Sequence, residues 1–410
     1  MSTRVTVVIP AYNAAEFVAE AIDSALAQTH RDVQVTVVDD GSTDATPAIL
    51  AGYGSRIAVV RQPNRGPAAA RNRAIRDADG ALVALLDADD RWEESFLAQG
   101  VARLAACDAS VVGAFSGWVL VDRAGHEIPD QRIVPSGPVG LRDLVLGNRF
   151  HPSTLVLRRR AVLDAGGFDE DVPIGVEDYD LWLRLAAGGG RFAAVGQCLC
   201  RYRVSEGSVS HRPDSMRAGR LLVLERLFAR AALPADVGAA RPRALASAYM
   251  QSAVQLYAAG RADEGARDVA LAVRSWPTLL DEDETYYAVV CASQPLGYKA
   301  SRHGLDLDEG ERRLAAALAR CAREQNVPSA ATQRAAHARA LGVLARLAYG
   351  QRRMAAARRY AVRALAARPA LWVDWPTVGT LVKSFAGATV IETLSRWKRP
   401  RRESSQGPAG

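Results

Sequence analysis

The chain has 410 residues, 49% of them apolar and 24% charged, which excludes a disordered or collagen-like protein and favours a soluble protein of two domains. The net charge of +7 is unevenly divided, because residues 1–215 are net negative and residues 216–410 strongly positive. Five scattered cysteines, no signal-peptide pattern and no run apolar enough to cross a membrane exclude a disulfide scaffold and a spanning helix, and they favour a cytoplasmic protein.

Strands and helices are expected to alternate along the first hundred residues. Short β-branched runs predict strands, and each is followed by a stretch with helical spacing of its apolar residues. In chain order these segments are 5–9, 14–27, 33–38, 43–50, 57–60, 67–78, 81–86 and 93–105. This alternation predicts an α/β domain with a mostly parallel sheet covered by helices on both faces.

The rest of the chain divides into two parts of different composition. Residues 107–215 predict strands at 111–121, 154–157 and 192–195, helices at 161–165 and 178–187, and a loop at 123–138. From about residue 216 the sequence is rich in alanine and arginine and predicts helices at 221–232, 244–259, 264–274, 310–325, 330–348 and 354–367. We therefore expect an α/β domain over 1–215, an all-α domain over 216–370, an amphipathic basic segment over 371–402 and a disordered tail over 403–410.

The helical part contains a weak internal repeat. Tyr257 and Pro277 in one copy correspond to Tyr349 and Pro369 in the other. A tyrosine, small residues and a closing proline are similar to tetratricopeptide pairs, although alanine-rich helices imitate such patterns easily.

Three polar clusters directly follow predicted strands, at residues 10–13, 39–44 and 87–90. In an open parallel sheet, ligands bind outside the carboxyl ends of the strands, so these clusters are expected to converge on one crevice. In the second cluster, Asp39 and Asp40 can accept N–H groups of a nucleobase, with Tyr12 stacked on the base. The alternative is turn chemistry, in which a hydroxyl or carboxylate at 42–44 caps the next helix.

The third cluster places Asp87, Asp89 and Asp90 within four residues, where like charges repel unless a cation compensates. Mg²⁺ and Mn²⁺ are held by one or two carboxylates plus substrate phosphates, so a metal site is expected here. A solvated acidic turn is the alternative. Arg65 and Arg71, at the start of the helix over 67–78, can face phosphates or remain ordinary surface arginines.

Two further segments carry candidate chemistry. Glu177 and Asp178 begin a helix, where acids complement the helix dipole, but their mutual repulsion can also raise a carboxylate pKa towards that of a general base. The basic, hydroxyl-rich stretch 201–210 is either a lid over a diphosphate or a linker.

Taken together, the motifs resemble those of family 2 glycosyltransferases of the GT-A fold. The matching stretches are VVIPAYN (7–13), VDDGSTD (38–44), LDADD (86–90), GGFDE (166–170) and EDYDLWLR (177–184), in the family's order across about residues 4–210. The resemblance implies a nucleotide-diphospho-sugar transferase with a Rossmann-like sheet, followed here by a helical domain that the resemblance does not cover.

The resemblance also implies a role for each matching residue. Asp178 would be the general base of an inverting transfer, and Asp90, with Asp89, would bind Mg²⁺ or Mn²⁺. His151 and Glu177 are expected on the acceptor side. The donor nucleotide would contact Pro10, Tyr12, Asp39, Asp40, Arg71, Asp87 and Asp89, and the diphosphate lid would comprise Arg203, Ser208 and Ser210. Many relatives carry a histidine where this chain has Ser205, which puts the role of that loop in doubt.

The expected partners follow from these roles. The donor would be a nucleotide-diphosphate sugar, with uridine or thymidine favoured and guanosine open, and the acceptor a sugar or lipid-linked hydroxyl in polysaccharide, lipid-linked glycan or glycoconjugate synthesis. Residues 378–397 with the basic run 398–402 predict either a helix lying on the inner face of an anionic membrane or a helix packed on the protein.

Other function classes fit less well. A nucleotidyltransferase usually has a Gly-rich phosphate loop where this chain has residues 10–13, and a catalytically inactive scaffold would not need the acids at 40, 89, 90 and 178. No Gly-x-Gly-x-x-Gly follows the first strand, which argues against a dinucleotide oxidoreductase, and no nucleic-acid-binding module accompanies the basic half.

Overall fold

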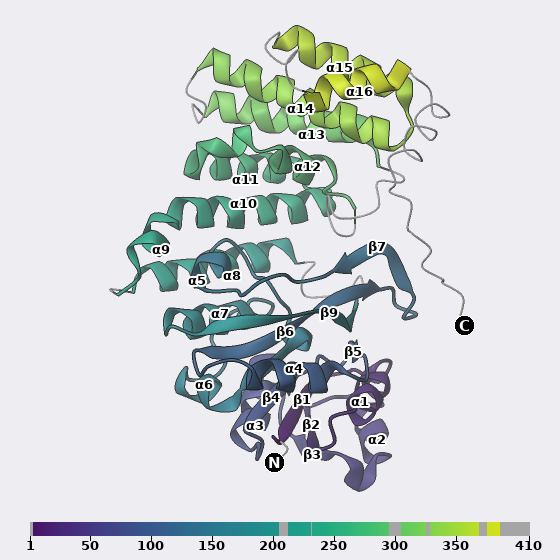
Figure 1. Ribbon diagram of the computed structural model, residues 1–410, viewed down its shortest axis with the longest axis vertical. Coiled ribbons are helices and arrows are strands. Elements are labelled where there is room, and N and C mark those ends of the chain that lie inside the picture. The colour runs from purple at the N-terminus through teal and green to yellow at the C-terminus, as the bar shows by residue number, and fades with distance from the viewer. Residues whose placement is uncertain are drawn as a thin grey trace, which may run out of the picture. The chain divides into compact units, whose positions relative to one another are not determined.

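A computed structural model describes residues 3–204, 212–230, 232–294, 305–324, 329–368 and 375–385. The chain divides into two compact units, residues 1–259 and residues 260–410 (Figure 1). Three helices that the sequence assigned to the second domain belong to the first unit: α8 (Pro213–Phe228), α9 (Ala235–Ala239) and α10 (Arg241–Ala258). The compact unit therefore extends beyond the boundary expected at residue 215, and the extent of the catalytic domain stays a prediction.

The first unit is built on a nine-stranded mixed sheet of order β3-β2-β1-β4-β8-β6-β9-β5, with β7 paired to β6. Its strands are β1 (Val5–Ala11), β2 (Val33–Asp39), β3 (Ala58–Arg61), β4 (Leu82–Leu85), β5 (Arg91–Trp92), β6 (Val111–Val121), β7 (Glu127–Ile133), β8 (Leu155–Arg158) and β9 (Arg191–Arg203). Strands β1 to β4 pair in parallel, whereas β8, β7 and β5 run antiparallel to their neighbours. The expected α/β fold is confirmed, and the sheet is parallel in the half that carries the polar clusters.

Helices pack against this sheet as the strand–helix alternation predicts (Figure 1). Helix α3 lies on β1 and β2, and α4 on β6, β8 and β9. The helices of the first half are α1 (Val18–Leu26), α2 (Thr46–Ala51), α3 (Pro67–Arg76), α4 (Phe96–Ala105), α5 (Leu141–Leu144), α6 (Arg159–Asp164) and α7 (Glu177–Ala187). Helix α3 begins sharply because Gly66 has a positive φ of 86° and Pro67 fits the first helical position, where its missing N–H is not needed.

The hydrophobic core joins the sheet to helices α7, α8 and α10. Trp182 of α7 is fully buried and contacts the rings of Phe150, Phe168 and Phe192. The same core continues into Leu224 of α8, which is 1% exposed, and on into α10. Residues 213–258 therefore contribute to the interior of the first unit and are not an appended layer.

Two segments differ from the sequence-based expectations. Residues 123–138, expected as a loop, contain the edge strand β7, whose polar residues concealed it and which pairs only with β6. The strand expected at 192–195 extends to Arg203, because β9 lies along the whole length of β6 through register shifts that interrupt the apolar pattern. This extension matters because it carries Tyr202 and Arg203 to the site described below.

The second unit consists of helices within its described residues. They are α11 (Ala262–Ser275), α12 (Asp283–Val290), α13 (Leu307–Arg323), α14 (Ala330–Gly350), α15 (Met354–Ala367) and α16 (Trp375–Phe385). Alanine and leucine fill its core, and α14 packs on both α15 and α16. None of the described helices combines the length and hydropathy needed to span a membrane. The repeat-like pairing and the basic segment 398–402 stay predictions, the latter lying outside the described residues.

Candidate active site

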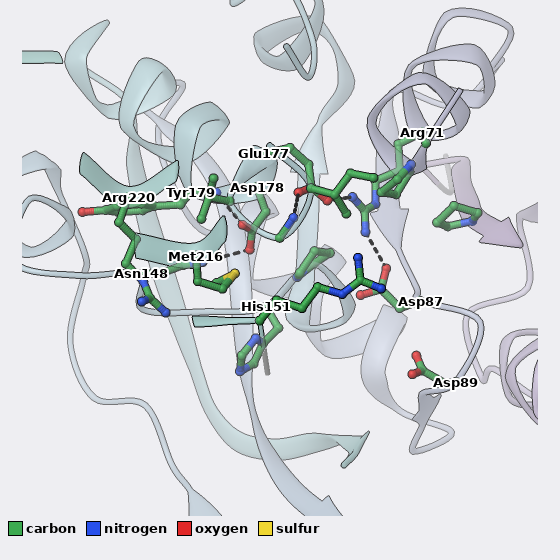
Figure 2. A pocket seen from close by; sticks show the side chains of 18 of the residues that line it. Arg71, Asp87, Asp89, Asn148, His151, Glu177, Asp178, Tyr179, Met216 and Arg220 are labelled. Carbon is green, nitrogen blue, oxygen red and sulfur yellow. Dashed lines mark hydrogen bonds and ion pairs between the residues drawn. The ribbon is translucent and has the colours of Figure 1, made fainter. Parts of the chain in front are cut away.

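One pocket of about 880 Å³ opens at the carboxyl ends of β1, β2 and β4 and lies wholly within the first unit. It brings together the three polar clusters that follow these strands and the start of α7. In Figure 2, Arg71, Asp87 and Asp89 lie on one side of this pocket, and Asp178, Asn148 and Arg220 lie on the other. The residues singled out from the sequence that line it are Pro10, Tyr12, Asp40, Arg71, Asp87, Asp89, His151, Glu177 and Asp178.

Asp40 shapes one end of the pocket. Its Oδ1 accepts hydrogen bonds from Gln62 Nε2 (2.8 Å) and the N–H of Arg65 (3.0 Å), and its Oδ2 accepts one from the N–H of Gly66 (2.8 Å). A carboxylate oxygen has two lone-pair sites, so Oδ2 keeps one acceptor position for a ligand. Tyr12 lies at the same end with half of its surface exposed, as a stacking platform requires.

The polar residues that follow Asp40 hold the loop after β1. Asn13 has a positive φ of 47°, and its side chain accepts a hydrogen bond from the N–H of Thr43 (2.8 Å). In return, the N–H groups of Asn13 and Ala15 donate to Ser42 Oγ (3.0 Å) and Asp44 Oδ2 (3.1 Å). The structural alternative considered for residues 42–44 is therefore realised, because these side chains fix the loop beside Tyr12.

Asp39 does not line the pocket. It is 1% exposed, accepts a hydrogen bond from the N–H of Ser42 (2.9 Å) and lies 3.3 Å from the guanidinium of Arg61. The carboxylate available to a nucleobase at this end is therefore that of Asp40.

The third cluster, like the second, contains acids that line the pocket and an acid that does not. Asp87 and Asp89 line the pocket, whereas Asp90 is 1% exposed and does not line it. Both oxygens of Asp90 are engaged, Oδ2 by the Ser153 hydroxyl (2.5 Å) and Oδ1 by the N–H of Arg203 (2.9 Å). Burial, together with the charge of Asp87, raises the pKa of Asp89 to about 6. Repulsion of this kind is what a bound cation would relieve.

Arg71 links the two sides of the pocket. Its guanidinium is almost fully buried and forms ion pairs with Asp87 (2.7 Å) and Glu177 (2.8 Å). Burial acts to lower the pKa of Arg71, but the two carboxylates outweigh it and the pKa rises. Its Nε has no hydrogen-bond partner within the described residues. Arg71 thus holds the acids of two distant segments in one place.

Asp178 has the electrostatics of a general base. Its carboxylate is 7% exposed, accepts hydrogen bonds from Asn148 Nδ2 (2.8 Å) and the N–H of Tyr179 (2.6 Å), and lines the pocket. Burial, then the charge of Glu177, raises the pKa of Asp178 to about 7. A base with a pKa near the working pH is the most effective one for proton transfer.

The remaining predicted residues have different surroundings. His151 is stacked on Tyr202 with ring centroids 4.3 Å apart, and burial lowers the pKa of His151 to about 4, so the ring is neutral at pH 7. Arg203 is buried, and its guanidinium donates to Glu20 (2.9 Å) and to the carbonyl of Asp89 (2.9 Å). It supports the third cluster instead of facing the pocket. Ser208 and Ser210 lie outside the described residues.

Several pocket residues were not found from the sequence. Asn148 follows Gly147 and reads as an ordinary turn, because its partner Asp178 lies 30 residues away. Ser153 does not line the pocket, but it donates to Asp90, 63 residues away, and the sequence gives no sign of that contact. The far wall of the pocket comes from α8 and α10, whose alanine-rich sequence gave no sign of a site. These wall residues are Arg212, Met216, Arg220, Leu224, Ala244, Ser247, Ala248 and Gln251.

Comparison with known proteins identifies the family. The family model described as glycosyl transferase family 2 matches residues 6–166. The succinoglycan biosynthesis protein ExoU of Rhizobium meliloti is 34% identical over 58% of this chain and 73% of its own length. The chain belongs to glycosyltransferase family 2. The resemblance seen in the motifs is therefore confirmed.

Other comparisons show how much of the chain is similar to known proteins. A glycosyltransferase of Rickettsia typhi is 34% identical over 45% of this chain, which spans 58% of that protein's length. The fold is similar to that of S. aureus TarS, residues 1–349, in complex with UDP (TM-score 0.50, 18% identity, 81% of this chain and 90% of that chain). The family match ends before α7, so Asp178 and the wall formed by α8 and α10 lie beyond it.

Proposed function

We propose that this family 2 glycosyltransferase moves a sugar, with inversion, from a nucleoside diphosphate donor to an acceptor hydroxyl. The observation that carries the proposal is that Asp40 and Asp178 line one continuous pocket. The TarS structure contains UDP, which supports a uridine diphosphate donor on the strength of a similar fold. ExoU is named for succinoglycan biosynthesis, and we place this chain in the synthesis of a polysaccharide or related glycan.

The donor end follows from Asp40, Tyr12 and the start of α3. The free acceptor position of Asp40 Oδ2 suits the imino N–H of uracil or thymine, and the ring of Tyr12 can stack on the base. Gly66, the last residue before α3, lines the pocket together with Pro67. The positive end of the helix dipole therefore faces the space that a diphosphate would occupy.

The acids at 87 and 89 fit a divalent cation. No group of three or more His, Cys, Asp or Glu residues is arranged around a metal position among the described residues. A pair of carboxylates completed by donor phosphates is, however, how Mg²⁺ and Mn²⁺ are commonly held. Because Asp90 is engaged by protein groups, we assign the ligand role to Asp89 with Asp87. When bound, the ion would neutralise charge on the leaving nucleoside diphosphate.

Asp178 acts on the acceptor. Its carboxylate removes the proton from the acceptor hydroxyl as that oxygen bonds to the anomeric carbon, and the bond from that carbon to the diphosphate breaks on the opposite face. Asn148 and the N–H of Tyr179 fix the orientation of the carboxylate. Neutral His151 and Tyr202, stacked on each other, line the same pocket as Asp87 and Asp178.

The first test is thermal stability of the full chain with UDP, TDP, GDP and CDP, each with and without Mn²⁺. A ligand that binds only the native state raises the melting temperature, and the proposal expects one nucleotide to do so in a metal-dependent way. Asp89→Asn should remove the metal-dependent part. If Asp90→Asn removes it and Asp89→Asn does not, Asp90 is the direct ligand. If no saturating nucleotide has an effect, the donor assignment is wrong.

A further inference from the structure

The wall of the pocket beyond Asp178 contains an arginine that the donor chemistry does not use. Met216, Arg220 and Leu224 are spaced four residues apart on α8, so they lie on one face of the helix, and all three line the pocket. Arg220 thus places a charge on an otherwise apolar stripe. In Figure 2 it lies on the side of Tyr179, Asp178 and Asn148, away from Asp89.

Arg220 has no counter-ion in the described part of the chain. Its Nη1 donates to the amide oxygen of Gln255 (2.8 Å), and no carboxylate there lies within ion-pair distance of its guanidinium. Burial lowers the pKa of Arg220 to about 10, partly offset by Tyr179 and Asp178. A desolvated cation normally has a paired anion, because an unpaired one costs free energy.

The two donor-side arginines that lie near the site are already paired with protein groups. Arg71 is neutralised by Asp87 and Glu177, and Arg203 by Glu20. Arg212 also lines the pocket but is exposed, so among the described residues Arg220 is the partly buried pocket cation that is left for a ligand. It lies at the acceptor end beside the proposed base.

The part of the pocket beyond Asp178, lined by α8 and α10, is called the chamber below. We infer that this chamber binds a glycosyl acceptor that carries a carboxylate, such as a uronic acid residue, and that Arg220 pairs with that carboxylate. The inference rests on the proposed function, which puts the acceptor beside Asp178. A planar guanidinium matches a carboxylate through two parallel hydrogen bonds. A singly charged group balances one arginine, whereas a phosphate dianion would bring excess negative charge next to Asp178.

The rest of the chamber suits a sugar ring. Met216, Leu224, Ala244 and Ala248 provide an apolar surface for the faces of the ring. Gln251 of α10, whose Nε2 donates to Ser247 (3.2 Å), provides a polar amide at its edge. A few polar groups on an apolar wall are typical of small-ligand sites.

The test measures binding of two probes to the full chain without nucleotide, by ligand-detected NMR. Methyl β-glucuronide and methyl β-glucoside differ only at C6, which is a carboxylate in the first and a hydroxymethyl group in the second. The wild-type protein should bind the glucuronide about 10-fold or more tightly, which is the usual gain in affinity from a charge-assisted hydrogen bond. Arg220→Gln should abolish the difference and Arg220→Lys should keep part of it. Arg217→Gln, on the same helix but outside the pocket, should keep all of it.

Equal binding of the two probes by the wild-type protein would overturn the inference, and this comparison needs no variant to fold. A preference that survives in Arg220→Gln would overturn the role of Arg220. Tighter binding of glucose 6-phosphate than of the glucuronide would show that the site prefers a phosphate and would overturn the assignment of a carboxylate. None of these results depends on donor binding, so a failure here is distinguishable from a failure of the nucleotide test.

Discussion

At the scale of single residues, the site depends on how each carboxylate is satisfied. Asp39 and Asp90 have protein partners for both oxygens, Asp40 keeps one acceptor position, and Asp178 is buried beside another acid. Neighbouring aspartates in one motif therefore differ in their surroundings, because one is held by protein groups and another lines the pocket. The sequence gives the motif but not this division, because the partners that decide it come from other segments.

Replacing Asp178 with asparagine should remove most of the turnover. The amide cannot accept the proton of the acceptor hydroxyl, so kcat should fall by about 10²–10⁴, the usual contribution of a general base. Nucleotide binding, followed by thermal shift, should be retained. Asp171→Asn, an exposed acid in the preceding loop, is the matched control and should leave kcat unchanged. A decrease of less than about threefold in Asp178→Asn would remove Asp178 from the mechanism.

The activity should depend on pH through Asp178. Because burial raises the pKa of Asp178 to about 7, kcat/KM should rise through about pH 7 and level off above it. Glu177→Gln removes the neighbouring negative charge and should move this rise to lower pH. The measurement is kcat/KM between about pH 5 and pH 9 for both proteins. A rise at the same pH in both would show that another group controls it.

The same pKa predicts how stability changes with pH. The pKa of Asp178 is raised in the folded state from a normal value of 3.8, so its contribution to stability is present below that value and is lost as the pH rises through about 7. Asp178→Asn should therefore become more stable relative to the wild type between about pH 5 and pH 8, by a few kcal/mol. Chemical denaturation at the two pH values measures this difference. A difference that does not change with pH would mean that Asp178 titrates normally.

At the scale of elements, the proposed base is held from a helix outside the family match. Ser247 of α10 donates its hydroxyl to the carbonyl of Leu146 (2.6 Å), two residues before Asn148, whose side chain donates to Asp178. The contact from Ser247 to Leu146 spans 101 residues. No pattern in the sequence connects the two segments, so this support could not be predicted, whereas the start of α7 with its acids could.

Ser247→Ala should lower turnover without weakening nucleotide binding. Loss of the hydrogen bond frees the loop at 146–148, and a base displaced by a fraction of an ångström loses about 3- to 10-fold in kcat. Ser252→Ala is the matched control on the same helix, because the Ser252 hydroxyl is buried without a hydrogen-bond partner in the described residues. The two variants are compared by kcat and by thermal shift with nucleotide. Equal kcat values would show that α10 does not position Asp178.

At the scale of the whole molecule, the first compact unit is larger than its motifs suggest. The parallel half of the sheet and its site were predictable, because each polar cluster follows an apolar strand. The boundary at 215 was placed where the composition changes, but burial does not follow composition. The core that contains Trp182 continues into Leu224 of α8 and Ala248 of α10.

Residues 1–259 expressed alone should therefore fold cooperatively, and residues 1–215 should not. Ending the chain at 215 exposes apolar surface that α8 and α10 cover, and each buried large side chain that loses its cover costs about 1.5–3 kcal/mol. Thermal unfolding followed by circular dichroism compares the two fragments with the full chain. If the 1–215 fragment unfolds cooperatively with a melting temperature near that of the full chain, the domain boundary expected from the sequence is correct.

The pocket has a consequence for how products diversify among relatives. The residues that line it come from two separate stretches of the chain: 10–202, which contains Asp40, Asp89 and Asp178, and 212–251, which forms the far wall. Mutations in the second stretch can reshape the chamber around Arg220 while leaving Asp40, Asp89 and Asp178 untouched. On the proposed function, substitutions within these about forty codons would change which acceptor is bound while the donor-side residues stay the same.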